Sequence, residues 1–224
     1  MFERMRGIWT EAMEPLVLKM GDLNPNVLTW TSLVLALGAF WLISSAGLDS
    51  NGAMVIGVSV LLILLAGVLD ALDGALARHQ GVAGPYGDFL DHTIDRVVDV
   101  GLLLAIGMNA TFVSDPSSGA VAALLTLFGS YMGTQAQSVG LNRIYGGFSR
   151  ADRLVLTVAC LVVASWQAYS GGAGFDLSGT GYADWVMLGN SNLNGMTAAL
   201  VISAWGGVYT FLSRFVRTRG QLLG

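Results

Sequence analysis

The stretch from Asp70 to Asp95 reads DALDGALARHQGVAGPYGDFLDHTID, and apolar segments flank it on both sides. A membrane-spanning helix needs about 20 predominantly apolar residues. One such run extends from about Ala53 to His79 and the next from about Tyr86 to Val113. The quoted stretch therefore predicts two spanning helices joined by a short turn, with polar ends that meet at one edge of the membrane.

The composition extends this prediction to the whole chain. Of its 224 residues, 54% are hydrophobic and 12% charged, with a mean hydropathy of +0.63. Soluble proteins carry about 25% charged residues. We therefore expect an all-α integral membrane protein with six transmembrane helices in residues 27–217. The other four predicted spans are Val27–Ala46, Gly119–Gln137, Ala151–Tyr169 and Met196–Val216.

The basic residues predict the orientation in the membrane. All eleven Lys and Arg lie before the first span, around the turn quoted above, between the fourth and fifth spans, or near the C-terminus. The opposite connections carry only acidic charges, among them Asp115 and Asp176. Since basic residues concentrate on the cytoplasmic side, the pattern predicts a multi-pass protein of the cell membrane whose polar turn faces the cytoplasm.

The N-terminal segment 1–22 reads as an amphipathic helix in the membrane interface rather than a cleavable signal peptide. It contains six charged residues within its first twenty positions, and its apolar residues share one broad face. A formal net charge of −4, without a basic stripe, argues against a nucleic-acid partner. With no composition shift that marks a linker, residues 1–224 are predicted to form one membrane domain.

The spacing of four aspartates suggests a metal site. Asp70 and Asp73 are three residues apart, and Asp91 and Asp95 are four apart, so each pair shares one helix face. Carboxylates that converge in this way repel one another unless cations neutralise them. Ligand sets made only of oxygen suit Mg²⁺ or Mn²⁺. We therefore expect one or two such ions at the turn.

The complete run, Asp70-x2-Asp73-Gly74-x2-Ala77-Arg78-x8-Gly87-x3-Asp91-x3-Asp95, resembles the signature of the CDP-alcohol phosphotransferase family. Members of that family cleave the diphosphate of a CDP-linked lipid or alcohol, release CMP and join the remaining phosphate to an acceptor hydroxyl. The resemblance implies that the partners are a CDP-lipid, a polar alcohol and the lipid bilayer. It also implies a homodimer, which is common in the family.

The resemblance also assigns roles to residues of this sequence. The first three signature aspartates, Asp70, Asp73 and Asp91, bind metal, and Asp95 both binds metal and serves as the general base. The positions that contact the CDP portion are implied to be Asn26, Thr29, Asp70, Gly74 and Arg78.

Three arginines between the fourth and fifth predicted spans bear on the acceptor. Arg143, Arg150 and Arg153 resemble the basic motif of the inositol-phosphate-using branch, which includes phosphatidylinositol phosphate and archaetidylinositol phosphate synthases. Arg150 and Arg153 are three residues apart, so both can reach one phosphate. The alternative is that these arginines only set topology and meet lipid headgroups.

Other functions remain open from the sequence. Glycerol phosphate or serine is an alternative acceptor for the same chemistry. From a different class, a divalent-cation transporter would also place acidic residues in membrane helices. Such a pathway would distribute polar residues through the depth of the membrane, whereas here they gather at one edge.

Overall fold

A computed structural model describes residues 15–142, 144 and 146–224, except for the side chains of residues 182 and 183. The chain is mostly helical and divides into two compact units. Unit 1 comprises the residues up to Gly38 together with Leu61–Val98. Unit 2 comprises Ala39–Val60 and Asp99–Gly224.

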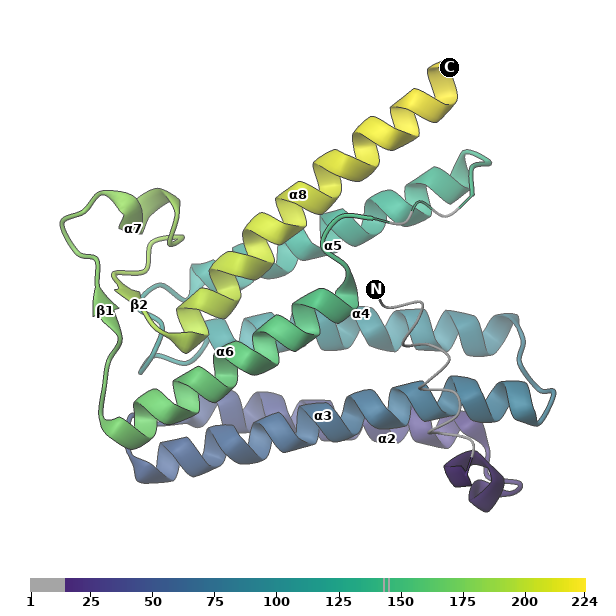
Figure 1. Cartoon of the computed structure of the whole chain (residues 1–224), viewed down its shortest axis with the longest axis horizontal. Coiled ribbons are helices and arrows are strands. Elements are labelled where there is room, and N and C mark those ends of the chain that lie inside the picture. Colours follow the sequence, from purple (N-terminus) through teal and green to yellow (C-terminus); the bar gives the residue numbers. More distant parts are fainter. Residues whose placement is uncertain (1–14, 143, 145) are drawn as a thin grey trace. The chain divides into compact units, whose positions relative to one another are not determined.

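Long helices occupy the segments that the apolar runs predicted (Figure 1). They are α2 (Pro25–Ser45), α3 (Ser50–His79), α4 (Pro85–Gly107), α5 (Ser117–Ser138), α6 (Arg150–Ser170) and α8 (Gly195–Leu223). The predicted boundaries were wrong at two ends. The third helix stops at Gly107 rather than Val113, and the last helix continues past Val216 to Leu223.

Four of these helices, α2, α3, α6 and α8, are long and apolar enough to cross a membrane. They mark the chain as a membrane protein. The acidic residues of α4 and the polar residues of α5 lower the hydropathy of those two helices. The count of six spans therefore stays a prediction.

The predicted amphipathic helix at the N-terminus lies largely outside the described residues. Residues 15–20 are helical, and within this piece Val17 is buried. It packs in one apolar cluster with Leu28 of α2 and with Leu72 and Leu76 of α3. The cluster joins the start of α2 to the polar end of α3 within unit 1.

In unit 2, α8 packs against α5 and α6, and Figure 1 shows α8 running alongside α5. Glycines permit this close packing. A Cβ atom on Gly207 would lie 2.7 Å from the carbonyl oxygen of Leu125, and one on Gly195 would lie 2.2 Å from that of Cys160. Small residues at such positions allow the backbones of membrane helices to touch.

The polar segment between α6 and α8 contains a short strand pair that the sequence did not predict. Strand β1 (Phe175–Asp176) pairs antiparallel with β2 (Asn192–Leu193), and the four-residue helix α7 (Tyr182–Trp185) lies between them in the chain.

Asn109 explains why the third long helix ends early. Its side-chain amide donates to the carbonyl oxygens of Ile43 and Ala46, at 2.7 and 2.9 Å. Its side-chain oxygen accepts from the backbone N–H groups of Thr111 and Phe112, both at 3.0 Å. The buried side chain thus caps the end of α2 and turns the chain after α4.

Replacing Asn109 with alanine is expected to lower the free energy of unfolding by about 2–4 kcal/mol, because four backbone groups, three of them in buried hydrogen bonds, lose their partner. Thermal or denaturant unfolding in detergent measures the change. The matched control is Asn51→Ala on the exposed surface of α3, which should shift stability by no more than about 0.5 kcal/mol. Equal stability of the two variants would contradict the assigned role.

Candidate active site

Three aspartates of unit 1 converge. Asp70 lies on α3, and Asp91 and Asp95 lie on α4. Each offers one carboxylate oxygen, and the three oxygens all lie within 4.8 Å of one another. We call these residues the aspartate cluster.

The turn between α3 and α4 brings the cluster together. The backbone N–H groups of Gln80 and Val82 donate to the carbonyl oxygens of Leu76 and Ala77, at 2.9 and 3.0 Å. Gly81 adopts a φ of 69°, in the left-handed region that favours glycine. The chain therefore reverses within a few residues, as predicted.

The donor set of the cluster fits a hard divalent cation. Its three carboxylates repel one another at this separation, and a bound cation removes the repulsion. Oxygen atoms are the ligands that Mg²⁺ and Mn²⁺ prefer. The cluster is therefore chemically suited to hold one of these ions.

Asp73 has a different environment from the other signature aspartates. It is buried, and the hydroxyl of Thr29 on α2 donates a hydrogen bond to its carboxylate. Thr29 is itself buried. The structure shows the Asp73 carboxylate in a contact between α2 and α3 within unit 1, and its role as a fourth metal ligand stays a prediction.

Gly74 and Arg78 lie together on the last turns of α3. A Cβ atom on Gly74 would lie 3.2 Å from a terminal nitrogen of Arg78, so the guanidinium folds back over the glycine. Gly87 differs, because a Cβ atom there would meet open space. Asn26 lies in the first turn of α2, where its backbone N–H donates to the Asn24 side chain at 3.0 Å. Asn24 therefore caps the helix.

Two neighbours of the cluster were not singled out from the sequence as site residues. The side-chain amide of Gln80 donates to the carbonyl oxygens of Gly21 and Leu23, both at 2.9 Å, and ties the segment before α2 to the turn after α3. The His92 ring nitrogen Nδ1 lies 3.2 Å from a carboxylate oxygen of Asp91. The Gln80 contacts have no sequence signal, because they join residues 57 and 59 positions apart. His92 is adjacent to Asp91 in the sequence, which is the signal that could have singled it out.

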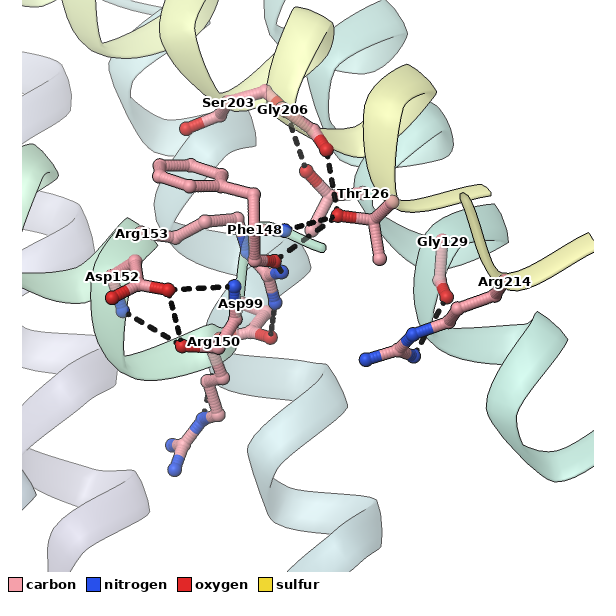
Figure 2. A network of polar contacts seen from close by, with 12 residues as sticks. Asp99, Thr126, Gly129, Phe148, Arg150, Asp152, Arg153, Ser203, Gly206 and Arg214 are labelled. Carbon is pink, nitrogen blue, oxygen red and sulfur yellow. Dashed lines mark hydrogen bonds and ion pairs between the residues drawn. The ribbon is translucent and has the colours of Figure 1, made fainter. Parts of the chain in front are cut away.

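A second group of charged residues lies in unit 2 (Figure 2). Arg150 Nε lies 3.4 Å from Asp99 Oδ1, and Arg153 Nη2 lies 2.8 Å from Asp99 Oδ2. Arg153 also donates through Nη1 to the carbonyl oxygen of Phe148, at 3.2 Å. The predicted acceptor-binding arginines Arg150 and Arg153 thus share one carboxylate, that of Asp99 on α4. Arg143, the third predicted arginine, lies outside the described residues.

The loop before α6 is fixed by local and long-range contacts. Ser149 and Asp152 form a capping box at the start of α6, which orients the first helical turn. The Phe148 N–H donates to the Thr210 hydroxyl at 2.9 Å, and Arg214 Nε donates to the carbonyl oxygen of Gly146 at 3.3 Å. These contacts tie the loop before α6 to α8 within unit 2.

Replacing Thr29 with valine is expected to lower the free energy of unfolding by about 1–3 kcal/mol, because the buried Asp73 carboxylate loses its hydroxyl donor at nearly constant volume. Thr29→Ser, which keeps the hydroxyl, is the control, and its free energy of unfolding should be closer to that of the wild-type chain. Unfolding in detergent distinguishes the two. A valine variant as stable as the serine variant would show that this hydrogen bond contributes nothing.

Known proteins resemble this chain in both sequence and fold. Residues 22–188 match the CDP-alcohol phosphatidyltransferase family. The archaetidylinositol phosphate synthase of Methanothermobacter thermautotrophicus is 30% identical over 159 residues, covering 71% of this chain and 76% of that protein. The phosphatidylinositol phosphate synthase of Cutibacterium acnes is 27% identical over 172 residues, covering 73% of this chain and 78% of that protein.

Crystal structures of the phosphatidylinositol phosphate synthase of Mycobacterium tuberculosis share the fold. The form with CDP-DAG bound has a TM-score of 0.66 and 22% sequence identity, covering 94% of this chain and 93% of that one. The complex with manganese and citrate has a TM-score of 0.68 and 20% identity, covering 92% of this chain and 88% of that one.

Proposed function

Because the chain belongs to the CDP-alcohol phosphatidyltransferase family, we propose that it transfers a phosphatidyl-type group from a CDP-lipid to inositol phosphate and releases CMP. The transferred group is diacylglycerol phosphate or its archaeal ether-lipid counterpart. The observation that carries the proposal is the aspartate cluster, which lies within the matched residues 22–188.

The residues of the cluster and those near it have different roles in this reaction. Asp70, Asp91 and Asp95 would hold Mg²⁺ or Mn²⁺, one or two ions, and Asp73 would contribute a further carboxylate. A bound ion supplies positive charge that stabilises the diphosphate and the departing CMP. Arg78 binds a phosphate oxygen of the CDP portion, and Gly74 leaves room for it. Asn26 and Thr29, on the first turns of α2, are the secondary contacts to the nucleotide.

Asp95 acts as the general base in this proposal. Its carboxylate takes the proton of the acceptor hydroxyl as the hydroxyl oxygen forms a bond to the phosphorus next to the lipid. The bond between that phosphorus and the bridging oxygen breaks, and CMP leaves with the electron pair. Direct attack of this kind needs no covalent enzyme intermediate.

Two observations support inositol phosphate as the acceptor. The relatives named above are archaetidylinositol phosphate and phosphatidylinositol phosphate synthases. Arg150 and Arg153 lie together at the start of α6, where two guanidinium groups and a helix N-terminus suit a phosphate. Glycerol phosphate or serine would use the same chemistry with another acceptor.

The membrane arrangement belongs to the same proposal. Six spans, with α4 and α5 added to the four most apolar helices, put the basic ends on the cytoplasmic side. The cluster would then act at the cytoplasmic edge of the cell membrane, where both CDP-lipid and a soluble acceptor are accessible. The functional form is a homodimer.

The test is CMP release by the purified chain supplied with CDP-diacylglycerol or CDP-archaeol, Mg²⁺, and inositol phosphate, glycerol phosphate or serine in turn. We expect release with inositol phosphate at least tenfold faster than with the other acceptors. Faster CMP release with another acceptor would refute inositol phosphate as the acceptor but leave the proposed transfer reaction standing. Absence of release with every acceptor, together with Mn²⁺ uptake into proteoliposomes, would instead favour a cation transporter.

A further inference from the structure

We propose that Asp99 is a positioning residue for acceptor binding, which acts by holding Arg150 and Arg153 at a fixed separation. The inference rests on the proposed role of these arginines in binding the acceptor phosphate. Asp99 falls outside the family signature, and its role is inferred from the contacts that it makes within unit 2.

The carboxylate of Asp99 engages both arginines at once. One oxygen contacts Arg153 at 2.8 Å, and the other contacts Arg150 at 3.4 Å. The Asp99 side chain is 13% exposed, so these contacts lie in a setting where water screens charge only weakly. A single acidic group therefore fixes two guanidinium groups that leave the same helix one turn apart.

The two arginines are not equivalent in this arrangement. The Arg153 side chain is 9% exposed and divides its terminal nitrogens between Asp99 and the Phe148 carbonyl. The Arg150 side chain is 30% exposed and makes the longer contact with Asp99. Arg150 is thus the more accessible of the two to the acceptor phosphate, whereas Arg153 also anchors the loop before α6.

The charge balance also follows from Asp99. The Asp99 carboxylate offsets part of the positive charge of the two arginines, so they bind a phosphate monoester less firmly than they would without it. Asp99 also compensates the buried Arg153, which would be costly without a partner. Asp99 thereby keeps the two arginines ordered at the start of α6.

The experiment measures the acceptor KM, the CDP-lipid KM and kcat for Asp99→Asn, with inositol phosphate as the acceptor. We expect the acceptor KM to rise about 10- to 100-fold, the range set by loss of a charged hydrogen bond of about 1.5–3 kcal/mol. The CDP-lipid KM should stay within about twofold of wild type. Asp184→Asn, an exposed charge change in α7, is the matched control and should alter neither constant.

A double-mutant cycle separates positioning from a general effect on folding. If Asp99 acts through the arginines, Asp99→Asn should have no further effect on the acceptor KM in the Arg150→Gln, Arg153→Gln background. Asp99→Glu, which keeps the charge, should recover most of the acceptor affinity. An additive effect in the cycle, or equal losses of kcat and affinity for both substrates, would overturn the proposal.

Two further measurements separate a loss of acceptor binding from a loss of folding or of catalysis. Should Asp99→Asn unfold because Arg153 is left without its countercharge, the neutral pair Asp99→Asn, Arg153→Gln replaces it. Because Asp99 also holds Arg150, the acceptor KM of this pair should be about tenfold or more above that of Arg153→Gln alone. A thermal-shift measurement of the binding of inositol phosphate and of inorganic phosphate tests the acceptor site without catalysis. A wild-type chain that binds neither refutes the proposed acceptor site. Wild-type binding that Asp99→Asn leaves unchanged refutes only the role of Asp99.

Discussion

Replacing Asp95 with asparagine is expected to slow CMP release about 10²- to 10⁴-fold, the range for loss of a general base. Asparagine keeps the size of the side chain and one oxygen, but it cannot accept the proton of the acceptor hydroxyl. Asp95 also belongs to the aspartate cluster, so the variant loses a charge next to Asp70 and Asp91. The rate at saturating CDP-lipid and acceptor measures the effect.

Metal titration distinguishes the two roles of Asp95. If its main contribution is as base, excess Mg²⁺ should leave the loss in Asp95→Asn unchanged. The same excess should partly restore Asp91→Asn, in which only the affinity for metal is weakened. Asp184→Asn serves as the control for an exposed carboxylate. Activity of Asp95→Asn within about tenfold of wild type would exclude it as the base.

Removing divalent cations with a chelator is expected to lower CMP release to background, and Mg²⁺ or Mn²⁺ should restore it. The three oxygens of the cluster, within 4.8 Å of one another, repel until a cation lies among them. A cation held by the cluster would both offset the charge of the substrate diphosphate and stabilise the fold at this point. Calcium, which prefers a larger oxygen cage, should restore less activity.

Thermal unfolding provides a readout of metal binding that is independent of catalysis. Millimolar Mg²⁺ should raise the melting temperature of the wild-type chain, and the rise should shrink in Asp70→Asn and Asp91→Asn. Full activity in a chain shown to be metal-free would refute metal dependence. A melting temperature that rises equally in wild type and in both variants would place the ion elsewhere.

The aspartate cluster could be predicted in part because its geometry depends on helix periodicity. Residues three or four apart share a face wherever the helix forms. The short turn at Gly81 reverses the chain, so that α4 returns alongside the end of α3 and the two aspartate-bearing faces meet. The contact of Asp73 could not be predicted from helix periodicity. Its partner Thr29 lies 44 residues away in the sequence, and only the packing of α2 against α3 brings the two side chains together.

The same limit applies to the arginines. The spacing of Arg150 and Arg153 predicted that they act together, but it could not show that Asp99, 51 and 54 residues away, lies against both. The helix end at Gly107 was missed for a related reason. The apolar pattern continues to Val113, and only the long-range contacts of Asn109 with the end of α2 reveal the turn.

The length of α8 has a consequence for the membranes that the protein can occupy. Its 29 residues extend about 43 Å, whereas the hydrocarbon core of a bilayer is about 30 Å thick. Arg217 and Arg219 lie near its C-terminal end and are exposed, with long side chains that can reach the headgroups from different depths. The helix can therefore accommodate thinner or thicker bilayers by a change of tilt.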